Sequence, residues 1–272
     1  QHGNFERVQR RSYGYRSQRL FAVCEILPVM NRCSALLLGL FLCAMPVLAL
    51  EEIRVGVELQ PYAPYSEVVE GEYRGYARDL LDAFAAEHGY RFVYTPLPVR
   101  RLLNDYLAGR VDLKFPDHPQ WNADQKTGHT LHYSHPAAPY VDGILLKPQH
   151  LGQGMQRIER LGTQNGFTPW PYLTEIHAGR IHLIQANQIE SLLRMASSDR
   201  VDAVYLNPKV VAHHLGQMGM ATDSLVYDPT LPHVEDHYYL SSIRHRQLIE
   251  AFNRFLAERA DLVTAIRLRH GL

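Results

Sequence analysis

Short strand-like segments alternate with amphipathic helical segments after residue 50. Residues 53–57, 90–97 and 111–115 have the β-branched and aromatic content of strands, and residues 75–88 and 102–107 place apolar side chains at helical spacing. Strands that are separated by helices pair in parallel, through right-handed crossovers. The sequence therefore predicts an α/β fold in which helices flank a sheet.

The same alternation recurs in the second half of the chain. Residues 161–163, 181–186 and 201–206 are strand-like, and residues 188–195 are helical by spacing. Each half carries the tripeptide Arg-Val-Asp where a helix gives way to a strand, with Asp112 and Asp202 in equivalent positions. We expect two similarly built α/β lobes, with these aspartates as hydrogen-bond acceptors at strand entries. The tail, residues 244–272, has one apolar stripe and is expected to be helical and to cover the first lobe.

An uncharged apolar run occupies residues 35–50, directly after the short polar segment that contains Arg32. Crossing a bilayer takes about 18–20 residues, and this run is shorter and contains Pro46. The pattern is typical of a secretory signal peptide, with a membrane anchor as the alternative. We predict an untranslated or disordered leader at residues 1–29, a cleaved signal peptide at residues 30–49, and a periplasmic location.

Charge and cysteine content change when this leader is set apart. The whole chain has a formal net charge of +0, with 28 basic and 28 acidic residues. The leader holds more arginines than acids, so the remainder is mildly acidic, without the basic excess of nucleic-acid-binding proteins. All three cysteines belong to the predicted leader and signal peptide, Cys24 to the leader and Cys33 and Cys43 to the signal peptide. The predicted mature protein therefore suits an oxidising compartment and has no cysteine nucleophile or cysteine metal ligand.

Open α/β sheets bind ligands beyond the carboxyl ends of their strands. In the first lobe this rule selects Glu58, Tyr62, Tyr65, Lys114, Asp117 and Trp121. In the second lobe it selects Gln164, Gly166, Phe167, Asn187 and Tyr205. Tyrosine and tryptophan offer stacking area together with a polar group, which suits a small polar solute.

Each of these residues also has a purely structural interpretation. Tyr62 and Tyr65 could cap the core of the first lobe, and Trp121 could anchor its own loop. Lys114 could point outward at the edge of the sheet. Backbone N–H groups after Gly166 could receive an anion if the segment that follows is helical. The sequence leaves these alternatives open.

Several stretches together resemble the family 3 extracellular solute-binding proteins, which are the two-lobed receptors of ABC importers. The stretches are residues 53–57, Pro-Tyr-Ala-Pro-Tyr at 61–65, Gly-Arg-Val-Asp at 109–112, Tyr-Ser-His-Pro at 133–136, and residues 200–205. The resemblance implies a type II-like periplasmic-binding-protein fold, in which each lobe is a sheet flanked by helices and a hinge lies between them. It implies a monomer that binds without catalysis and without a cofactor.

The extended segment at residues 139–147 is a candidate for the hinge crossing that leads out of the first lobe, and residues 225–228 and 237–241 are candidates for the crossing that leads back. The first lobe would then comprise residues 50–142 and 237–272, and the second lobe residues 143–236. The expected function is binding of a small polar solute, an amino acid or a related compound, and its delivery to an ABC permease.

The sequence departs from the family at one position of the ligand site. Amino-acid-binding members usually carry Thr-x-x-Arg before the Tyr-Ser-x-Pro motif, and that arginine clamps the α-carboxylate of the ligand. Here residues 122–133 contain no arginine, and Lys126 is the nearest cation. A lysine supplies a point charge without the two parallel bonds of a guanidinium. We expect Lys114 or Lys126 to meet the anionic part of the ligand.

Three other functions are weighed against this one. A sensor input domain would pass the bound ligand's signal to a membrane partner. A lyase-like enzyme on the same fold could use Glu58 and Asp117 as an acid–base pair. A metal-binding protein could use His129, His132 and His135, but in an extended chain steps of three place successive histidines on opposite faces, which disfavours a shared metal.

Overall fold

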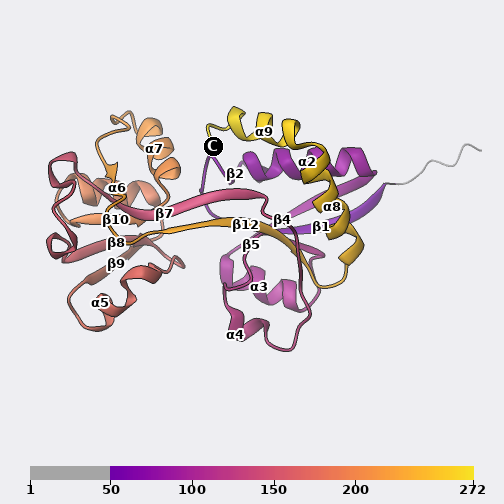
Figure 1. The fold of residues 1–272 in the computed structure, drawn as a ribbon, viewed down its shortest axis with the longest axis horizontal. Coiled ribbons are helices and arrows are strands. Elements are labelled where there is room, and N and C mark those ends of the chain that lie inside the picture. Colours follow the sequence, from indigo (N-terminus) through magenta and orange to yellow (C-terminus); the bar gives the residue numbers. More distant parts are fainter. Residues whose placement is uncertain (1–49) are drawn as a thin grey trace, which may run out of the picture. The chain divides into compact units, whose positions relative to one another are not determined.

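The computed structural model describes residues 50–272 (Figure 1). The predicted leader and signal peptide lie outside the described residues. Within residues 50–272, each helix is too short or too polar to cross a membrane.

The sheet of the first lobe contains three parallel strands. β1 (Glu51–Glu58) lies between β4 (Tyr90–Leu97) and β5 (Leu113–Asp117), and it pairs along its whole length with β4. The crossovers are α2 (Tyr76–His88) and α3 (Val99–Leu107). This arrangement confirms the predicted α/β fold of the first half of the chain.

The second lobe repeats this design. β8 (Arg160–Gln164) pairs in parallel with β9 (His182–Ala186) on one side and β10 (Ala203–Leu206) on the other. The helices of this lobe are α5 (Leu173–His177), α6 (Ile189–Ser197) and α7 (Pro208–Gln217), and its short 3₁₀ turns are Pro148–His150, Met155–Arg157 and Trp170–Tyr172. The chain after Gly166 therefore becomes helical only at Trp170, so the helical segment considered from the sequence does not begin at Gly166.

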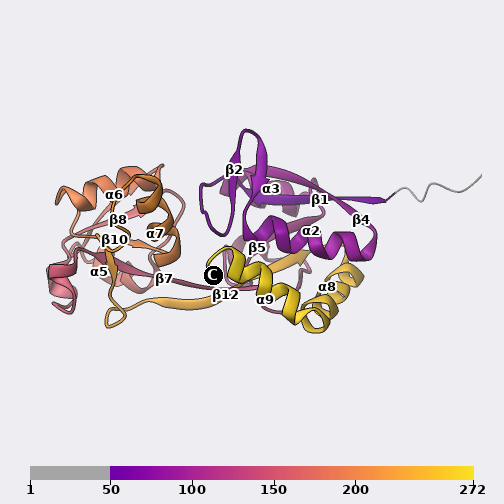
Figure 2. The ribbon, with the colours of Figure 1, turned by 90° about the horizontal axis from the view of Figure 1, so that it is seen from above.

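Two long strands connect the lobes. β7 (Ala138–Leu146) and β12 (Val234–Ser242) pair with each other in antiparallel register, from Ala138 opposite Tyr238 to Asp142 opposite Val234. β12 also pairs with β5 of the first lobe, and β7 pairs with β10 of the second. Figures 1 and 2 both show β7 and β12 running side by side between the lobes, and we call them the hinge strands.

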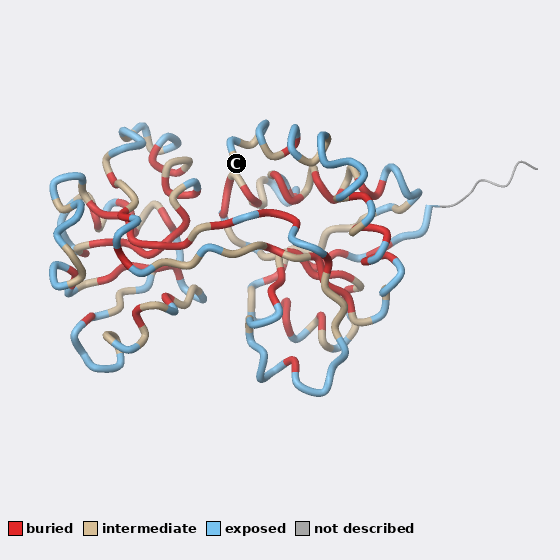
Figure 3. Tube along the Cα trace, in the orientation of Figure 1, coloured by how far each residue is buried: buried red, intermediate tan, exposed pale blue. Residues whose placement is uncertain are grey.

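The C-terminal tail covers the first lobe with two helices, α8 (Arg246–Glu258) and α9 (Ala260–Arg269). Phe252 and Phe255 of α8 pack on Phe84 of α2, with ring centroids 5.1 and 5.5 Å apart. Burial follows the strands and the inward faces of these helices (Figure 3). The apolar stripe predicted from the sequence therefore covers the first lobe as expected, although the tail is divided into two helices.

Both Arg-Val-Asp tripeptides hold a strand entry in the same way. Asp112 accepts hydrogen bonds from the backbone N–H of Arg54, at 2.9 Å, and from its guanidinium group. Asp202 accepts equivalent bonds from the backbone N–H and the guanidinium group of Arg160, each at 2.7 Å. The predicted structural role of the two aspartates is confirmed.

The remaining elements are short. They are β2 (Glu67–Val69), β3 (Glu72–Arg74), α4 (Ala123–Lys126), β6 (His132–Tyr133) and β11 (Val226–Tyr227). α4 lies in the long loop after β5, and the turn that carries Tyr62 and Tyr65 lies directly after β1. These two loops follow the carboxyl ends of neighbouring strands, which brings them to one edge of the sheet.

Candidate ligand-binding cleft

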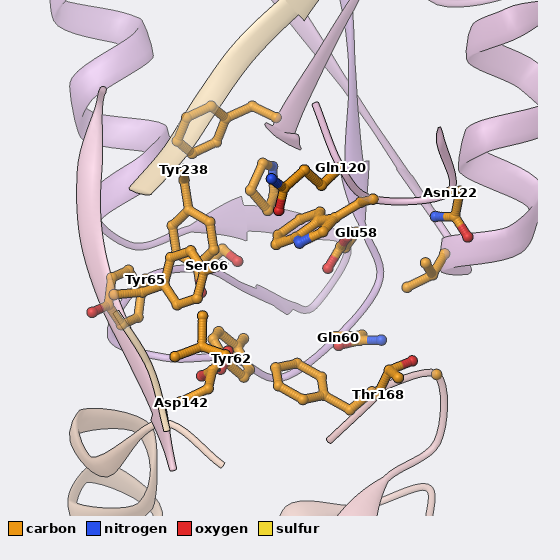
Figure 4. Close-up of a pocket in the computed structure, with 18 of the residues that line it drawn as sticks. Glu58, Gln60, Tyr62, Tyr65, Ser66, Gln120, Asn122, Asp142, Thr168 and Tyr238 are labelled. Carbon is orange, nitrogen blue, oxygen red and sulfur yellow. The ribbon is translucent and has the colours of Figure 1, made fainter. Parts of the chain in front are cut away.

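A cavity of about 420 Å³ lies at this edge of the first lobe, bounded by both hinge strands and by the loop after β8 of the second lobe (Figure 4). Aromatic side chains are the most numerous class in its lining. They are Tyr62, Tyr65, Tyr76, Phe115, Trp121, Tyr140, Phe167, Trp170, Tyr205 and Tyr238. A cavity that combines aromatic walls with converging polar side chains is a typical site for a small molecule.

The structure brings some of the candidate site residues together in this cavity and leaves others outside its lining. Those in the lining are Glu58, Tyr62, Tyr65, Trp121, Gly166, Phe167 and Tyr205. Those outside it are Lys114, Asp117, Lys126, Gln164 and Asn187. The carboxyl-end rule thus located the cavity, whereas the two lysines belong to another group of side chains.

The aromatic rings form a continuous wall from the first lobe to the second. The ring of Tyr62 lies 6.0 Å from that of Tyr65 and 5.7 Å from that of Phe167, centroid to centroid. Tyr140 of β7 and Tyr238 of β12 stack at 4.5 Å. Figure 4 shows Tyr62, Tyr65 and Tyr238 gathered beside the cavity, with Asp142 next to Tyr62. A ligand here would touch both lobes and both hinge strands.

Asp142 is the acidic residue of the hinge strand β7, and it lines the cavity. It is 8% exposed, and its Oδ1 accepts a hydrogen bond of 3.2 Å from the Tyr62 hydroxyl. Among the described residues, no lysine, arginine or histidine lies within 4.0 Å of its carboxyl group. Burial raises the pKa of Asp142 to about 7.

Glu58 is the second carboxyl group of the cavity wall, at the last position of β1. Burial raises the pKa of Glu58, Lys114 opposes this by its positive charge, and Asp117 adds to it. Glu58 is therefore a desolvated acid whose negative charge is partly balanced by the positive charge of Lys114.

Lys114 and Lys126 form a buried cluster with Asp117 beneath the loop after β5. Their ammonium groups lie 3.1 and 2.9 Å from Asp117 Oδ1, and the Ser241 hydroxyl donates to Oδ2 at 2.7 Å. Each lysine also donates to a backbone carbonyl oxygen, Lys114 at 2.6 Å and Lys126 at 2.7 Å. Burial works against ionisation of Asp117, but the two lysines and Ser241 outweigh it and lower its pKa. The cluster holds the loop in place, and its cations are absent from the cavity lining.

Gln164 and Asn187 occupy other positions in the second lobe. Gln164 is buried at the end of β8, and Asn187 is exposed and accepts a hydrogen bond from Asn165. Sequence reasoning instead missed the polar residues that do line the cavity besides Asp142, which are Gln60, Ser66, Gln120, Asn122, Asp124 and Thr168. Each of them lies within two residues of a candidate chosen from the sequence. Including the neighbours of each candidate would therefore have found them.

Hydrogen bonds also join the lobes beside the cavity. His214 of α7 bonds through Nε2 to the Pro61 carbonyl oxygen at 3.0 Å and through Nδ1 to Glu190 at 2.8 Å. Asn207, at the start of the same helix, donates to the Tyr65 hydroxyl at 3.4 Å. The first-lobe loop that carries Tyr62 and Tyr65 is thus held by the second lobe.

No family model and no curated protein matches the sequence. Solved structures match the fold of the chain. An ancestral arginine-binding protein bound to arginine is 18% identical, with 80% of this chain and 97% of that chain covered and a TM-score of 0.63. The amino acid ABC transporter substrate-binding protein AbpA from Streptococcus pneumoniae, bound to L-arginine, is 18% identical, with 79% and 93% covered and a TM-score of 0.59.

A third match is an ancestral amino acid-binding protein, AncCDT-1, described as a precursor of cyclohexadienyl dehydratase. It is 18% identical, with 80% and 95% of the two chains covered and a TM-score of 0.60. Matches that extend over nearly the whole of each neighbour show that this chain has the two-lobed periplasmic-binding-protein fold. The fold resembles that of the amino acid substrate-binding proteins of ABC transporters, as the sequence motifs predicted.

Proposed function

We propose that the protein binds a small polar solute in the cleft between its lobes and does not transform it. The observation that carries this proposal is the composition of the cavity wall, to which Tyr62 of the first lobe, Asp142 of the hinge and Phe167 of the second lobe all contribute. A ligand that touches every part of a hinged molecule binds the closed form more tightly, and it therefore shifts the population towards that form.

In this proposal two rigid bodies move relative to each other. The first lobe comprises residues 50–142 together with residues 237–272, and the second lobe comprises residues 143–236. The hinge strands pair between Asp142 and Val234, and this pairing ends where the strands separate into the two lobes. A few φ/ψ changes at such strand ends are enough for domain closure.

The bound solute would be delivered to an ABC importer from the periplasm. The structural neighbours support this step, because one of them is an amino acid ABC transporter substrate-binding protein. A periplasmic sensor that passes ligand binding to a membrane partner would use the same closure. An assay of solute uptake in cells that lack this protein separates the two, since only the transport role predicts lost uptake.

A lyase-like reaction is the weaker proposal. Its sequence basis was the pair Glu58 and Asp117, but Asp117 is fully engaged by Lys114, Lys126 and Ser241. An acid–base catalyst has to reach the substrate proton. Asp117 is absent from the cavity lining, so this pair offers one carboxyl group instead of two. Chemical change of any bound solute during incubation with the protein would contradict the binding role.

A thermal-shift screen of small polar metabolites tests the proposal. A ligand at about 100 times its Kd stabilises the folded state by about 2.7 kcal/mol and raises Tm. Hits are then titrated against Tyr65→Ala, which shortens the cavity wall, and against the surface variant Glu70→Ala as the matched control. The proposal expects one ligand per chain and weaker binding only in Tyr65→Ala. It is contradicted if no solute binds, or if both variants bind as the unaltered protein does.

A further inference from the structure

The charges that line the cleft are all of one sign. Glu58 and Asp142 line its interior, and Asp124 lies at its exposed rim. The lining contributed by the described residues contains no lysine, arginine or histidine. An anionic group placed here would lose its hydration and meet carboxylates instead of a counter-charge, which is strongly unfavourable.

The two nearest lysines do not change this balance inside the cleft. Lys114 and Lys126 share Asp117 as their counter-ion, and their remaining polar contacts are backbone carbonyl oxygens. The two lysines carry one more charge than Asp117 balances. The positive charge of Lys114 acts on Glu58, because it lowers the pKa of Glu58 while burial raises it. Asp142 has no such partner, so it is the carboxyl group of the cleft whose charge is left uncompensated.

The aromatic wall around Asp142 has the chemistry that attracts cations. A cation within about 6 Å of a tyrosine or tryptophan ring face is drawn to the ring quadrupole. Trp121 already has such a cation, because Lys114 Nζ lies 5.8 Å from its ring centroid. In the described part of the chain, no lysine or arginine stands over the rings of Tyr62, Tyr65, Tyr140 and Tyr238.

We propose that the solute is a small organic cation, an amine, guanidinium or quaternary ammonium compound, whose positive group lies against Asp142 within the tyrosine wall and which needs no carboxylate for recognition. This inference rests on the proposed binding function and names its ligand class. The amide and hydroxyl groups of Gln60, Gln120 and Thr168 in the same lining would bind a neutral polar end of the ligand.

The proposal also explains why an acidic residue occupies a buried hinge position. An uncompensated buried carboxyl group costs stability, and burial raises the pKa of Asp142 to about 7. A cation in contact with Asp142 favours the ionised form, so binding would displace the proton and affinity would increase with pH between about 6 and 8.

The other titratable groups that face Asp142 stay neutral in this interval. They are Tyr62 after β1, Tyr65 in the same loop, Tyr140 on β7, Tyr205 on β10 and Tyr238 on β12, and burial raises the pKa of each. Glu58 also has a raised pKa, but it lies next to Lys114, outside the immediate surroundings of Asp142.

Three pairs of probes that differ only by a carboxylate test the ligand class by calorimetry at pH 7.5. They are agmatine against arginine, cadaverine against lysine, and tetramethylammonium against glycine betaine. The proposal expects at least one carboxylate-free cation to bind, and to bind at least tenfold more tightly than its partner.

The outcomes distinguish failure of the cation inference from failure of the proposed binding function. If the carboxylate-bearing partner binds more tightly, or if only neutral or anionic solutes of the metabolite screen bind, the cation inference fails and the binding function stands. If none of the six probes and no solute of the screen binds, the proposed function fails as well.

Asp142→Asn tests the position of the cation, with Asp223→Asn as the matched control because it removes the carboxylate of an exposed aspartate outside the cavity lining. The asparagine oxygen still accepts the Tyr62 hydrogen bond, so the fold should be retained, and Tm confirms this. We expect affinity for the cation to fall at least tenfold in Asp142→Asn, with its pH dependence lost, and to change less than about twofold in Asp223→Asn. Equal affinity in Asp142→Asn and the unaltered protein would overturn the assignment.

Discussion

Two buried aspartates near the cleft have opposite surroundings. Asp117 lies between two lysines and a serine hydroxyl, which lower its pKa although it is 0% exposed. Asp142 is 8% exposed, accepts a hydrogen bond from a tyrosine hydroxyl, and has a pKa raised by burial to about 7. The first is compensated within the protein and holds a loop, whereas the second is uncompensated and faces a cavity. Compensation, more than burial or residue type, distinguishes the structural acid from the candidate ligand-binding acid.

The largest expected effect comes from removing the charge of Asp117. Asp117→Asn would leave Lys114 and Lys126 buried without the counter-ion that they share, and removing one partner of a buried ion pair typically costs about 3–5 kcal/mol. Urea denaturation at pH 7.5 measures the free energy of unfolding. Asp142→Asn is the matched comparison, and it should leave stability unchanged or raise it, because it removes an uncompensated carboxylate. Equal destabilisation by both substitutions would remove the distinction between the two aspartates.

The second effect is the pH dependence of stability in the absence of ligand. The raised pKa of Asp142 means that the folded state holds a proton that the unfolded chain loses near pH 4. Stability from this group is therefore fully present below about pH 4 and is lost as pH rises through about 7, by on the order of 2–4 kcal/mol. Asp117, with a lowered pKa, contributes in the opposite sense, and its contribution is lost only as pH falls below about 4.

The free energy of unfolding between pH 4 and pH 8 measures this difference. The Asp142→Asn profile should lack the decrease that the unaltered protein shows towards pH 7. If the two profiles are parallel, Asp142 does not titrate in this interval and the argument for an uncompensated carboxyl group is wrong.

The smallest effect concerns the hydrogen bond that the Asp142 carboxyl group accepts from Tyr62. Tyr62→Phe keeps the ring in the aromatic wall and removes the hydroxyl that donates to Asp142 at 3.2 Å. We expect a loss of about 1 kcal/mol in stability and a further increase in the pKa of Asp142. Tyr65→Phe is the control, because its hydroxyl donates to the Pro139 carbonyl oxygen. A change in the pH profile that appears only in Tyr62→Phe is the expected result, and the same change in both variants would contradict it.

The fold was largely predictable because its signals are local. Alternating strand and helix periodicity predicted the α/β architecture. The apolar face of α2 and the glycine after it predicted a helix that ends at Gly89, and Gly89 has the left-handed conformation of a C-cap, at φ 73°. The division of the tail near Arg259 lay outside these signals. The carboxyl-end rule found Glu58, Tyr62 and Trp121 because each follows a strand of the first lobe.

The charges of the site were harder to predict because they depend on folding of the loop after β5. The position of Lys114 on its strand alone predicts that it contacts the ligand. In the structure, the loop brings Lys126 to the same carboxyl group of Asp117 that Lys114 binds, so both lysines are engaged within the protein. Asp142 escaped the carboxyl-end rule because it lies within a hinge strand. The available signal was one acid among apolar residues in the segment Ala138–Leu146.

The central claim is that Asp142, and neither lysine, meets the charged group of the solute. Calorimetric titration of the tightest ligand against the unaltered protein, Asp142→Asn and Lys114→Met tests it most directly. The account predicts at least a tenfold loss of affinity in Asp142→Asn and less than about a threefold change in Lys114→Met, with Tm checked for both. A large loss in Lys114→Met together with unchanged binding in Asp142→Asn would contradict it.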